Sequence, residues 1–282
     1  MHTSSFFSVV HSTLSQVVQQ SSKMCSATTF DSKPFAQGRF RMAYKGTYTD
    51  PPKKAGQTCV VKELKDSYTW KPTDWNMTLD IQREAQKLAE GFNQFSSTDH
   101  PIHFTDVVVH KVTKSVGRPK LNEYVVVEDF IPGTYKKWVN NYGDISDESK
   151  SMPAFAHWSW VHTKGEIMIA DLQGVRGDHE YVLTDPVLLS GTVHGKYGCT
   201  DTAIEGMAMF FLKHQCNEFC NSLPKPSVHS VGIPQSQITA AFQLLQMLST
   251  STAYSHEMKF PVHVRESLIP VFKAIASGYR TY

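Results

Sequence analysis

The chain has 282 residues, which is enough for one large domain or for two lobes. Its formal net charge of +2 gives no electrostatic reason to expect a nucleic-acid or membrane partner, and no apolar run is long enough to span a bilayer. The five cysteines, an odd number with two close to a histidine, argue against a disulfide framework and favour metal binding or free thiols in the reducing cytoplasm.

The N-terminal stretch, residues 1–29, is expected to be a disordered leader. It is rich in serine and threonine, carries little charge, and lacks the basic start and the long apolar core of a signal peptide. Structure is expected to begin near Phe30. Residues 39–44 alternate apolar with polar or small side chains, and this period of two predicts a strand. Residues 59–64 predict a second strand that ends in charge.

A single glycine, Gly38, precedes the first of these strands, and one lysine, Lys62, lies in the second. Backbone N–H groups in such a turn can bind phosphate, and a lysine on the facing strand can supply positive charge. The turn lacks the three-glycine spacing of ordinary protein kinases and also lacks the Walker pattern. On these residues alone, an ordinary turn beside a solvated strand end remains the alternative to a phosphate site.

One helix and two more strands are expected in the middle of the chain. Residues 79–92 carry apolar side chains at helical spacing, so we assign this helix to packing and keep Glu84 only as a candidate partner for Lys62. The β-branched runs at 107–109 and 124–127 predict strands. The chain is then expected to leave the sheet through a turn. By composition alone, the basic and aromatic residues that follow this turn form a surface turn.

Two carboxylates and a carboxamide lie next to apolar structure. Residues 167–170 predict a buried strand, with Asp171 and Gln173 at its end and Gly174 as the residue that breaks it. After a polar loop, Asp185 precedes a proline, which disfavours a helical residue at that position. Hard oxygen ligands of this kind suit Mg²⁺. Simple capping of turns is the alternative for each aspartate.

A candidate zinc site lies at His214, Cys216 and Cys220. Zinc takes neutral imidazole and thiolate ligands in a tetrahedral arrangement. Residues two apart on a helix point about 200° apart, so a helix that begins at Ala203 must end near His214 or be distorted there if all three residues bind one ion. Two buried thiols near a surface histidine are the alternative. By itself, His157 in its aromatic run would be a hydrogen-bonded core histidine.

The C-terminal stretch shows no readable chemistry. Residues 235–248 and 264–276 have the apolar spacing of amphipathic helices, and Pro270 is expected to interrupt the second. We expect both helices to pack against the preceding domain.

Taken together, the motifs resemble the alpha-kinase family of atypical serine/threonine kinases, which includes the myosin heavy chain kinases, the elongation-factor kinase and the channel-fused kinases. Four motifs carry the resemblance: P-F-x-x-G-x-x-R at 34–41, D-L-Q-G-V at 171–175, L-T-D-P at 183–186 and H-x-C-x-x-x-C at 214–220. The resemblance implies an α+β, two-lobed, protein-kinase-like fold with a structural zinc site in the C-lobe. The N-lobe would cover residues 30–130 and the C-lobe residues 131–282.

The same resemblance implies a role for each site residue. For ATP, it implies binding by Gly38, Arg41, Lys62, Glu128, Gln173 and Asp185, with Glu128 at the adenine. For Mg²⁺, it implies coordination by Gln173 and Asp185. For catalysis, it implies that Asp171 orients or deprotonates the hydroxyl of a protein serine or threonine and that Lys137 stabilises the transferring phosphoryl group. For structural zinc, it implies the ligands His157, His214, Cys216 and Cys220.

One loop departs from the family pattern. Where relatives usually carry G-x-x-N-L-G-x-x-G to help hold the peptide substrate, this chain keeps Gly198 and Gly206 but has Asp201, Thr202 and Ala203 between them. We expect altered substrate handling, with the charge of Asp201 favouring basic residues beside the acceptor. A zinc-stabilised pseudokinase that binds without turnover is the alternative function, although the retained lysine and carboxylates favour the enzyme.

Overall fold

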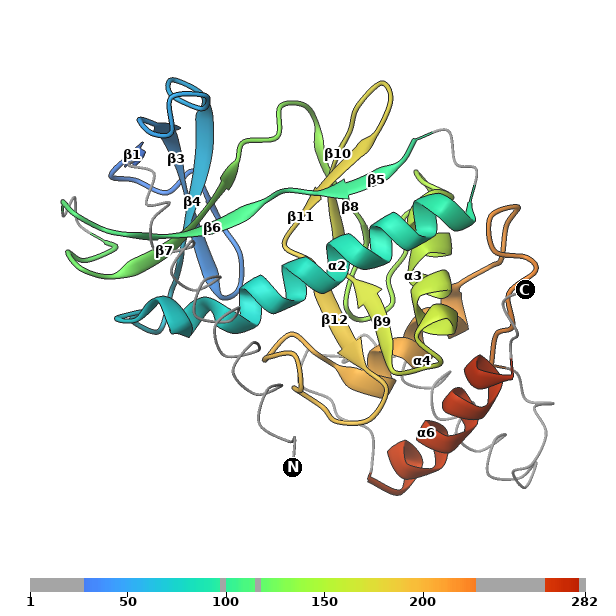
Figure 1. The fold of residues 1–282 in the computed structure, drawn as a ribbon. Helices are drawn as coiled ribbons and strands as arrows, with labels where there is room; N and C mark the ends of the chain where they lie inside the picture. Colours follow the sequence, from blue (N-terminus) through green and yellow to red (C-terminus); the bar gives the residue numbers. More distant parts are fainter. Residues whose placement is uncertain (1–27, 97–99, 115–117, 227–261, 279–282) are drawn as a thin grey trace, which may run out of the picture. The chain divides into compact units, whose positions relative to one another are not determined.

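The computed structural model describes residues 28–96, 100–114, 118–226 and 262–278, which form two compact units (Figure 1). The first unit contains the described residues up to Asn76 together with Asp106–Phe130. The second contains the described parts of Met77–Thr105 and of the chain from Ile131 onward. Within these ranges every helix is too short or too polar to cross a membrane. The expected mixture of helices and strands is confirmed.

The first unit is built on an antiparallel sheet of six strands in the order β1-β3-β4-β7-β6, with β2 paired to β3. The elements are β1 (Thr28–Phe30), β2 (Ala36–Gln37), β3 (Arg41–Tyr48), β4 (Thr58–Leu64), the 3-10 helix η1 (Pro72–Trp75), β6 (Val107–Lys111) and β7 (Tyr124–Asp129). The strands expected at 59–64, 107–109 and 124–127 are confirmed. β3 corresponds to the strand expected at 39–44 but begins at Arg41 and continues to Tyr48, and Tyr44 and Tyr48 both face the buried core.

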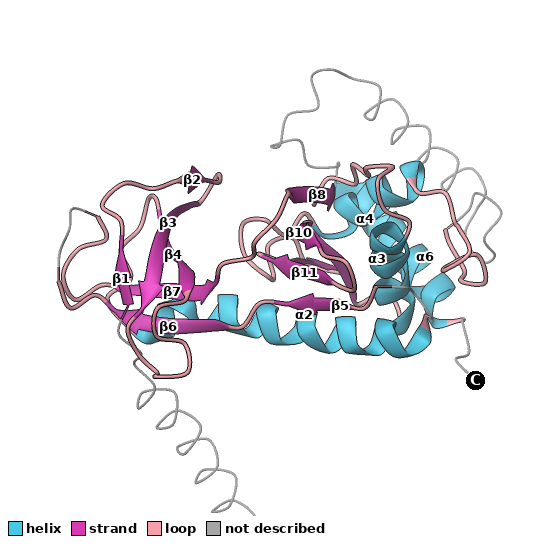
Figure 2. Cartoon of the chain, turned by 90° about the horizontal axis from the view of Figure 1, so that it is seen from above, coloured by secondary structure: helices cyan, strands magenta, loops and turns pink. Residues whose placement is uncertain are grey.

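The second unit combines helices with two small sheets. One sheet has the order β5-β11-β10-β8, with β5 parallel to β11, and the other is the antiparallel pair β12-β9. The elements are α2 (Asn76–Phe95), β5 (Ile102–Phe104), β8 (Tyr135–Val139), α3 (Ser151–His162), β9 (Ile167–Ala170), β10 (Leu172–Arg176), β11 (Tyr181–Thr184), β12 (Val187–Ser190), α4 (Ala203–Lys213) and α6 (Val262–Ser277). Figure 2 shows α3, α4 and α6 gathered at one end of this unit.

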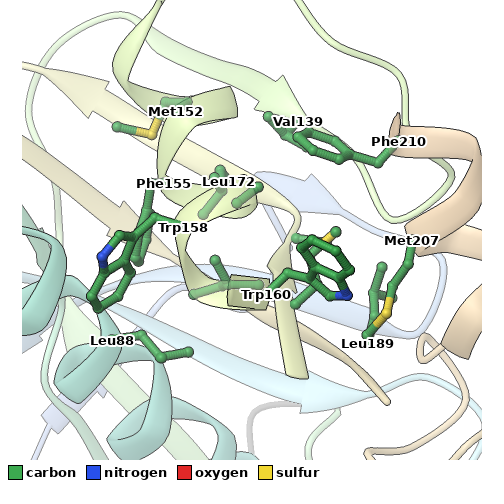
Figure 3. Close-up of a cluster of buried hydrophobic side chains, with 14 of the residues drawn as sticks. Leu88, Val139, Met152, Phe155, Trp158, Trp160, Leu172, Leu189, Met207 and Phe210 are labelled. Atoms are coloured by element: carbon green, nitrogen blue, oxygen red, sulfur yellow. The ribbon is translucent and has the colours of Figure 1, made fainter. Parts of the chain in front are cut away.

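Helix α3 forms the centre of the main core, and all its residues from Ser151 to Val161 are buried. Figure 3 shows Met152, Phe155, Trp158 and Trp160 of this helix within the core cluster. The helix expected at 79–92 is confirmed as α2, which groups with the second unit although the sequence assigned its residues to the N-lobe. The reason is its apolar face. Phe92 packs against α3, with ring centroids 5.2 Å from Phe155 and 5.8 Å from Trp158.

The expectation that Gly174 ends a strand is wrong. This glycine lies inside β10, which pairs with β11 on one side and with β8 on the other. A Cβ at Gly174 would lie 2.1 Å from the carbonyl oxygen of Val182, and the backbone has φ +153°. Glycine is therefore required for the close approach of β11. β8, expected as a surface turn, completes this part of the sheet.

The C-terminal helix α6 packs on α3 and α4. Its buried side chains join the main core: Leu268, Val271, Phe272 and Ala276. The helix continues through Pro270, so the expected interruption is wrong. Arg265 donates from Nε to Glu205 of α4 at 2.8 Å. The helix expected at 235–248 and the leader up to residue 27 lie outside the described residues.

Candidate active site and metal centre

In the first unit, Lys62 and Glu128 form a buried ion pair. β4 and β7 are in register so that Val60 faces Glu128 and Lys62 faces Val126, which makes the two charged residues diagonal neighbours on one face of the sheet. The Lys62 ammonium contacts the Glu128 carboxylate, and both side chains are almost fully buried. Removing either charge would leave the other buried without this partner, which is costly. The pair therefore holds both groups in fixed positions.

Glu84, the candidate partner for Lys62, has a lysine partner on its own helix. Glu84 lies on α2 in the second unit, and its carboxylate is 3.5 Å from the ammonium of Lys87, one turn along the same helix. That pair is solvent-exposed and contributes little. Lys62 instead receives its carboxylate from the neighbouring strand of its own sheet, through Glu128.

The glycine turn of the first unit leads into β3. The Gly38 N–H donates to the carbonyl oxygen of Arg41 at 2.9 Å, and the Arg41 guanidinium lies 5.8 Å from the ring centroid of Trp75. A Cβ at Gly38 would meet nothing closer than 4.0 Å. The fold itself therefore does not require glycine here. The Gly38 N–H is already bonded within the turn, but the absence of a side chain at this exposed position leaves room for a ligand to approach the backbone.

In the second unit, three neighbouring strands bring the other candidate residues together. Gln173 of β10 faces Lys137 of β8 on one side and Thr184 of β11 on the other. Asp185 follows β11 directly, and the side-chain amide of Gln173 approaches its carbonyl oxygen at 3.5 Å. Residues in register on neighbouring antiparallel strands lie on the same face of the sheet. The topology thus gathers a lysine, a carboxamide and a carboxylate at one place.

The two aspartates occupy corresponding positions where the chain passes from one sheet to the other. Asp171 lies between β9 and β10, and Asp185 lies between β11 and β12. Both have left-handed backbones, with φ +52° at Asp171 and +51° at Asp185. Aspartate is among the few non-glycine residues that tolerate this region, at a cost of roughly 1 kcal/mol or more. Strained backbone at paired carboxylates is typical of functional sites.

The Asp171 carboxylate is mostly buried and has two donors close to it. Its Oδ1 lies 3.2 Å from the Lys137 ammonium and accepts the Asn141 N–H at 3.1 Å. Burial raises the pKa of the Asp171 carboxyl above its ordinary value; the Lys137 charge and the Asn141 N–H oppose this shift, and the Asp185 charge adds to it. A carboxylate with a raised pKa is a stronger base, which suits it to take a proton from a hydroxyl.

Asn141 is a residue of this site to which the sequence gave no role. Besides its bond to Asp171, its side-chain amide donates to the carbonyl oxygen of Thr200 at 2.7 Å. Its own carbonyl oxygen accepts the Thr202 hydroxyl at 2.7 Å. Asn141 therefore connects Asp171 to the loop before α4. The motif N-x-G at 141–143 was the sequence feature that could have drawn attention to Asn141. Its glycine is required by packing, because the backbone of Gly143 lies directly against α4 near Phe210.

The expectation that Asp201 presents its charge to a basic peptide is wrong. The residue is fully buried. Its Oδ1 accepts N–H groups from Ser190 at 2.9 Å and from Ala203 at 2.8 Å, and its Oδ2 accepts the Tyr197 N–H at 3.1 Å. A short side chain that accepts several backbone N–H groups fixes a turn rather than a ligand. Asp201 therefore shapes this loop from within.

Ala203 adopts the conformation that glycine would favour. Its backbone has φ +52°, and the residue is fully buried. Gly206 has a different requirement, since a Cβ there would lie 2.2 Å from the Thr202 hydroxyl and 2.8 Å from the Asn141 carbonyl oxygen. The loop thus keeps glycine where packing demands it and places alanine where the backbone is strained.

The four expected zinc ligands meet in the second unit. α4 ends at Lys213, and His214 has an extended backbone, which is the helix end that the metal-site hypothesis allowed. The ligand atoms of His157, His214, Cys216 and Cys220 all lie within 4.8 Å of one another. The His157 Nδ1–His214 Nε2 distance is 3.2 Å, Cys220 Sγ–His214 Nε2 is 3.5 Å and Cys216 Sγ–His157 Nδ1 is 3.8 Å. Ligands in a tetrahedral zinc site are separated by about 3.3–3.8 Å, so this set fits the ion.

The surroundings also suit these residues to metal binding. The Nε2–H of His157 donates to the Pro224 carbonyl oxygen at 2.8 Å, which leaves Nδ1 as the free lone pair inside the cluster. Burial lowers the pKa of His157 to about 4 and that of His214 to about 3, so both imidazoles are neutral. Neutral imidazole is the form that binds zinc.

Comparison with known proteins gives consistent matches. The family model described as the alpha-kinase family matches residues 36–220. The chain is 30% identical over 235 residues to alpha-protein kinase 1 of Dictyostelium discoideum, covering 83% of this chain and 16% of that protein. It is 28% identical over 208 residues to myosin heavy chain kinase B of the same organism, covering 73% and 27%. The chain spans less than a third of the length of these relatives.

Solved structures agree in fold. An alpha kinase from Entamoeba histolytica is 27% identical and superimposes with a TM-score of 0.58, covering 69% of this chain and 77% of that one. The inactive alpha-kinase domain of myosin heavy chain kinase A, solved in complex with ATP, is 22% identical with a TM-score of 0.59, covering 69% and 88%. The second comparison concerns the fold alone.

Proposed function

The chain belongs to the alpha-kinase family, and from this premise we propose that it transfers the γ-phosphate of ATP to serine or threonine hydroxyls of a protein substrate. The observation that carries the proposal is the arrangement around Asp171. A buried carboxylate with a raised pKa lies 3.2 Å from a lysine, on a strained backbone, in the strands that also hold Gln173 and Asp185. A fold that needed only stability would not require this combination.

For the nucleotide, we assign Lys62, Glu128, Gly38 and Arg41. Lys62 would place its charge on the phosphates, and Glu128 would accept a hydrogen bond at the adenine while it holds Lys62 in position. The exposed turn at Gly38 would lie against the phosphates, with the Arg41 side chain beside it. The support for this assignment is the buried pair on β4 and β7, which fixes the lysine before any ligand binds.

For the chemical step, the acceptor hydroxyl oxygen attacks the γ-phosphorus as the bond to the ADP oxygen breaks. Asp171 takes the hydroxyl proton, and Lys137 neutralises charge on the oxygens of the phosphoryl group during its transfer. Asn141 keeps the Asp171 carboxylate in place through its backbone N–H. Gln173 and Asp185 would hold Mg²⁺ through their side-chain oxygens, and the bound ion would neutralise charge on the phosphates. Catalysis of this type consists mostly of positioning and charge neutralisation.

For the metal centre, we propose one structural zinc ion held by His157, His214, Cys216 and Cys220. Four protein ligands leave no position for water, so the ion would stabilise the second unit and take no part in transfer. Because binding energy of such an ion is folding energy, Cys216→Ser should unfold this unit rather than slow an intact enzyme. Metal analysis of purified protein should find about one zinc per chain. A folded, metal-free wild type would contradict this assignment.

The test of the whole proposal is incubation of the purified chain with labelled ATP and Mg²⁺, followed by separation of phosphoamino acids. The chain itself and casein serve as acceptors, and Asp171→Asn is the matched inactive control. Phosphoserine or phosphothreonine above this control supports the kinase. A wild type that binds MgATP in a thermal-shift assay yet transfers no more phosphate than Asp171→Asn would instead be a pseudokinase.

A further inference from the structure

An exposed aromatic patch lies in the first unit, on the loop between β4 and η1 and on the turn before β7. It consists of Tyr68, Trp70 and Leu121, which are 46%, 51% and 49% exposed. The Tyr68 and Trp70 rings stack with centroids 5.7 Å apart and an interplanar angle of 24°. Exposed tyrosine and tryptophan side chains are typical of the anchors that carry most of the energy in protein interfaces.

The backbone beneath the aromatic patch is held by a buried carboxylate. Glu123 accepts the Thr69 N–H on Oε1 at 3.2 Å and the Lys120 N–H on Oε2 at 2.6 Å. The Tyr124 N–H donates to the Thr69 carbonyl oxygen at 2.7 Å. Glu123 therefore ties together the two segments that present the patch. Since the anchors are fixed before binding, a partner does not have to order them.

Lysines surround the aromatic patch. The Arg118 guanidinium lies 3.5 Å from the buried carboxylate of Glu63, and Glu123 is buried beneath the patch. The other charged residues in 65–74 and 118–122 are three lysines and two carboxylates: Lys65, Lys71 and Lys120 against Asp66 and Asp74. The Lys120 ammonium lies 4.3 Å from the Tyr68 ring centroid. Among the described residues, no carboxylate pairs with the side chains of Lys65, Lys71 or Lys120. These lysines can therefore meet charges on a partner.

We propose that the aromatic patch is a docking surface for an acidic peptide segment of a partner protein, in which apolar side chains alternate with carboxylates. The apolar side chains would pack on Trp70 and Leu121, and the carboxylates would pair with Lys120 and Lys71. A nucleic acid fits less well. The Tyr68 ring already contacts Trp70, Lys120 and Arg118, so it offers little surface for a base to stack on. The formal net charge of only +2 also gives little attraction for a polyanion.

The test is fluorescence anisotropy with the full chain and a labelled peptide in which glutamates alternate with phenylalanine and leucine. We expect saturable binding that weakens with salt, because exposed charge pairs are screened. Trp70→Ala and Lys120→Glu should each weaken it about tenfold or more. Val193→Ala, an exposed valine elsewhere, and Lys87→Glu, an exposed charge reversal on α2, should not change it.

Matched peptides separate the two parts of the recognition. Replacing glutamate by lysine, or the apolar residues by alanine, should abolish binding. The proposal is overturned if the acidic peptide does not bind, if Trp70→Ala binds it as well as wild type, or if a single-stranded oligonucleotide or a synthetic peptide of residues 1–27 competes for the same site more strongly. Thermal melts of each variant should match wild type, because the substituted side chains are exposed. The measurement is one of binding, so it stays decisive even if the chain proves to be a pseudokinase.

Discussion

The chain contains two lysine–carboxylate pairs built from the same chemistry in different settings. Lys62 and Glu128 are 7% and 6% exposed and lie within a regular antiparallel ladder. Lys137 and Asp171 are 43% and 15% exposed and meet where the backbone is left-handed. The first pair is closed and rigid, which suits a group that must hold a ligand. In the second pair, which is open, the lysine is partly exposed to solvent, which suits groups that must interact with a substrate whose charge changes during the reaction.

The largest effect should come from Asp171→Asn. Loss of a general base typically costs 10²–10⁴-fold in rate, so phosphotransfer should fall by about that factor. Asparagine also tolerates a left-handed backbone, so the change is one of charge alone. Calorimetry should show MgATP affinity retained in Asp171→Asn and lost in Asp185→Asn. Equal loss of affinity in the two variants would refute the division of roles between the aspartates.

Substitutions in the buried pair of Lys62 and Glu128 should lower the stability of the folded chain. Glu128→Gln or Lys62→Met leaves one buried charge without its partner, which should cost about 3–5 kcal/mol of unfolding free energy in urea. The double variant Lys62→Met/Glu128→Leu should recover most of that stability while it remains unable to bind ATP. If Asp171→Asn proves as unstable as Glu128→Gln, the two pairs do not differ in kind.

The open pair should show its raised pKa in the pH dependence of turnover. Asp171 must be ionised to take a proton, so the rate should fall as pH drops through its pKa, at a higher pH than for an ordinary aspartate. Because Lys137 opposes the shift, Lys137→Met should move this limb to still higher pH, in whatever activity remains. If the acidic limb of the pH–rate profile stays at the same pH in Lys137→Met, Lys137 does not influence the pKa of Asp171.

Ionisation of Asp171 should raise the rate of transfer but lower the free energy of unfolding. A carboxyl whose folded pKa is raised contributes stability that is full below its unfolded pKa and is lost as pH rises through the folded pKa. At neutral pH the ionised Asp171 therefore works against folding, so Asp171→Asn should unfold at an equal or higher temperature than wild type. Calorimetric melts at neutral pH would check this, and a clear loss of stability would mean that Lys137 and Asn141 outweigh burial.

The smallest effect concerns the backbone near the open pair. Ala203→Gly relieves a left-handed alanine and should stabilise the chain by up to about 1 kcal/mol. Ala208→Gly, in the interior of the same helix, should instead cost about 1 kcal/mol. Denaturation midpoints of the two variants give the comparison. A destabilised Ala203→Gly would show that the strain at this position is negligible.

Some features could be predicted from the sequence because they depend on local spacing. If His214 and Cys216 bind one ion, the helix had to end near His214 or be distorted there, and the structure shows the first alternative, with α4 ending at Lys213. Three of the four candidate zinc ligands come from one segment, in the motif at 214–220. The ion pair of Lys62 with Glu128 could not be predicted, since it depends on the register between β4 and β7.

Other features required knowledge of the neighbouring strands. β10 was missed because Gly174 resembles a strand end until β11 lies against it. Asp201 was misread because a carboxylate in a loop is usually exposed, whereas here its partners are N–H groups from both sides of the loop. The role of Asn141 depends on Asp171, Thr200 and Thr202, which only the folded chain brings to it.

Helix α6 shows that the region similar to other alpha-kinases is shorter than the region that packs into one core. The family match ends at residue 220, yet Phe272 packs against both Trp160 and Phe211, with its ring centroid 5.9 Å from each of theirs. A chain cut after residue 226 would keep every candidate catalytic and zinc-binding residue. It would also expose the face of α3 and α4 that α6 covers and leave Glu205 buried without Arg265. The boundary that matters for producing a stable protein is therefore set by burial and not by similarity.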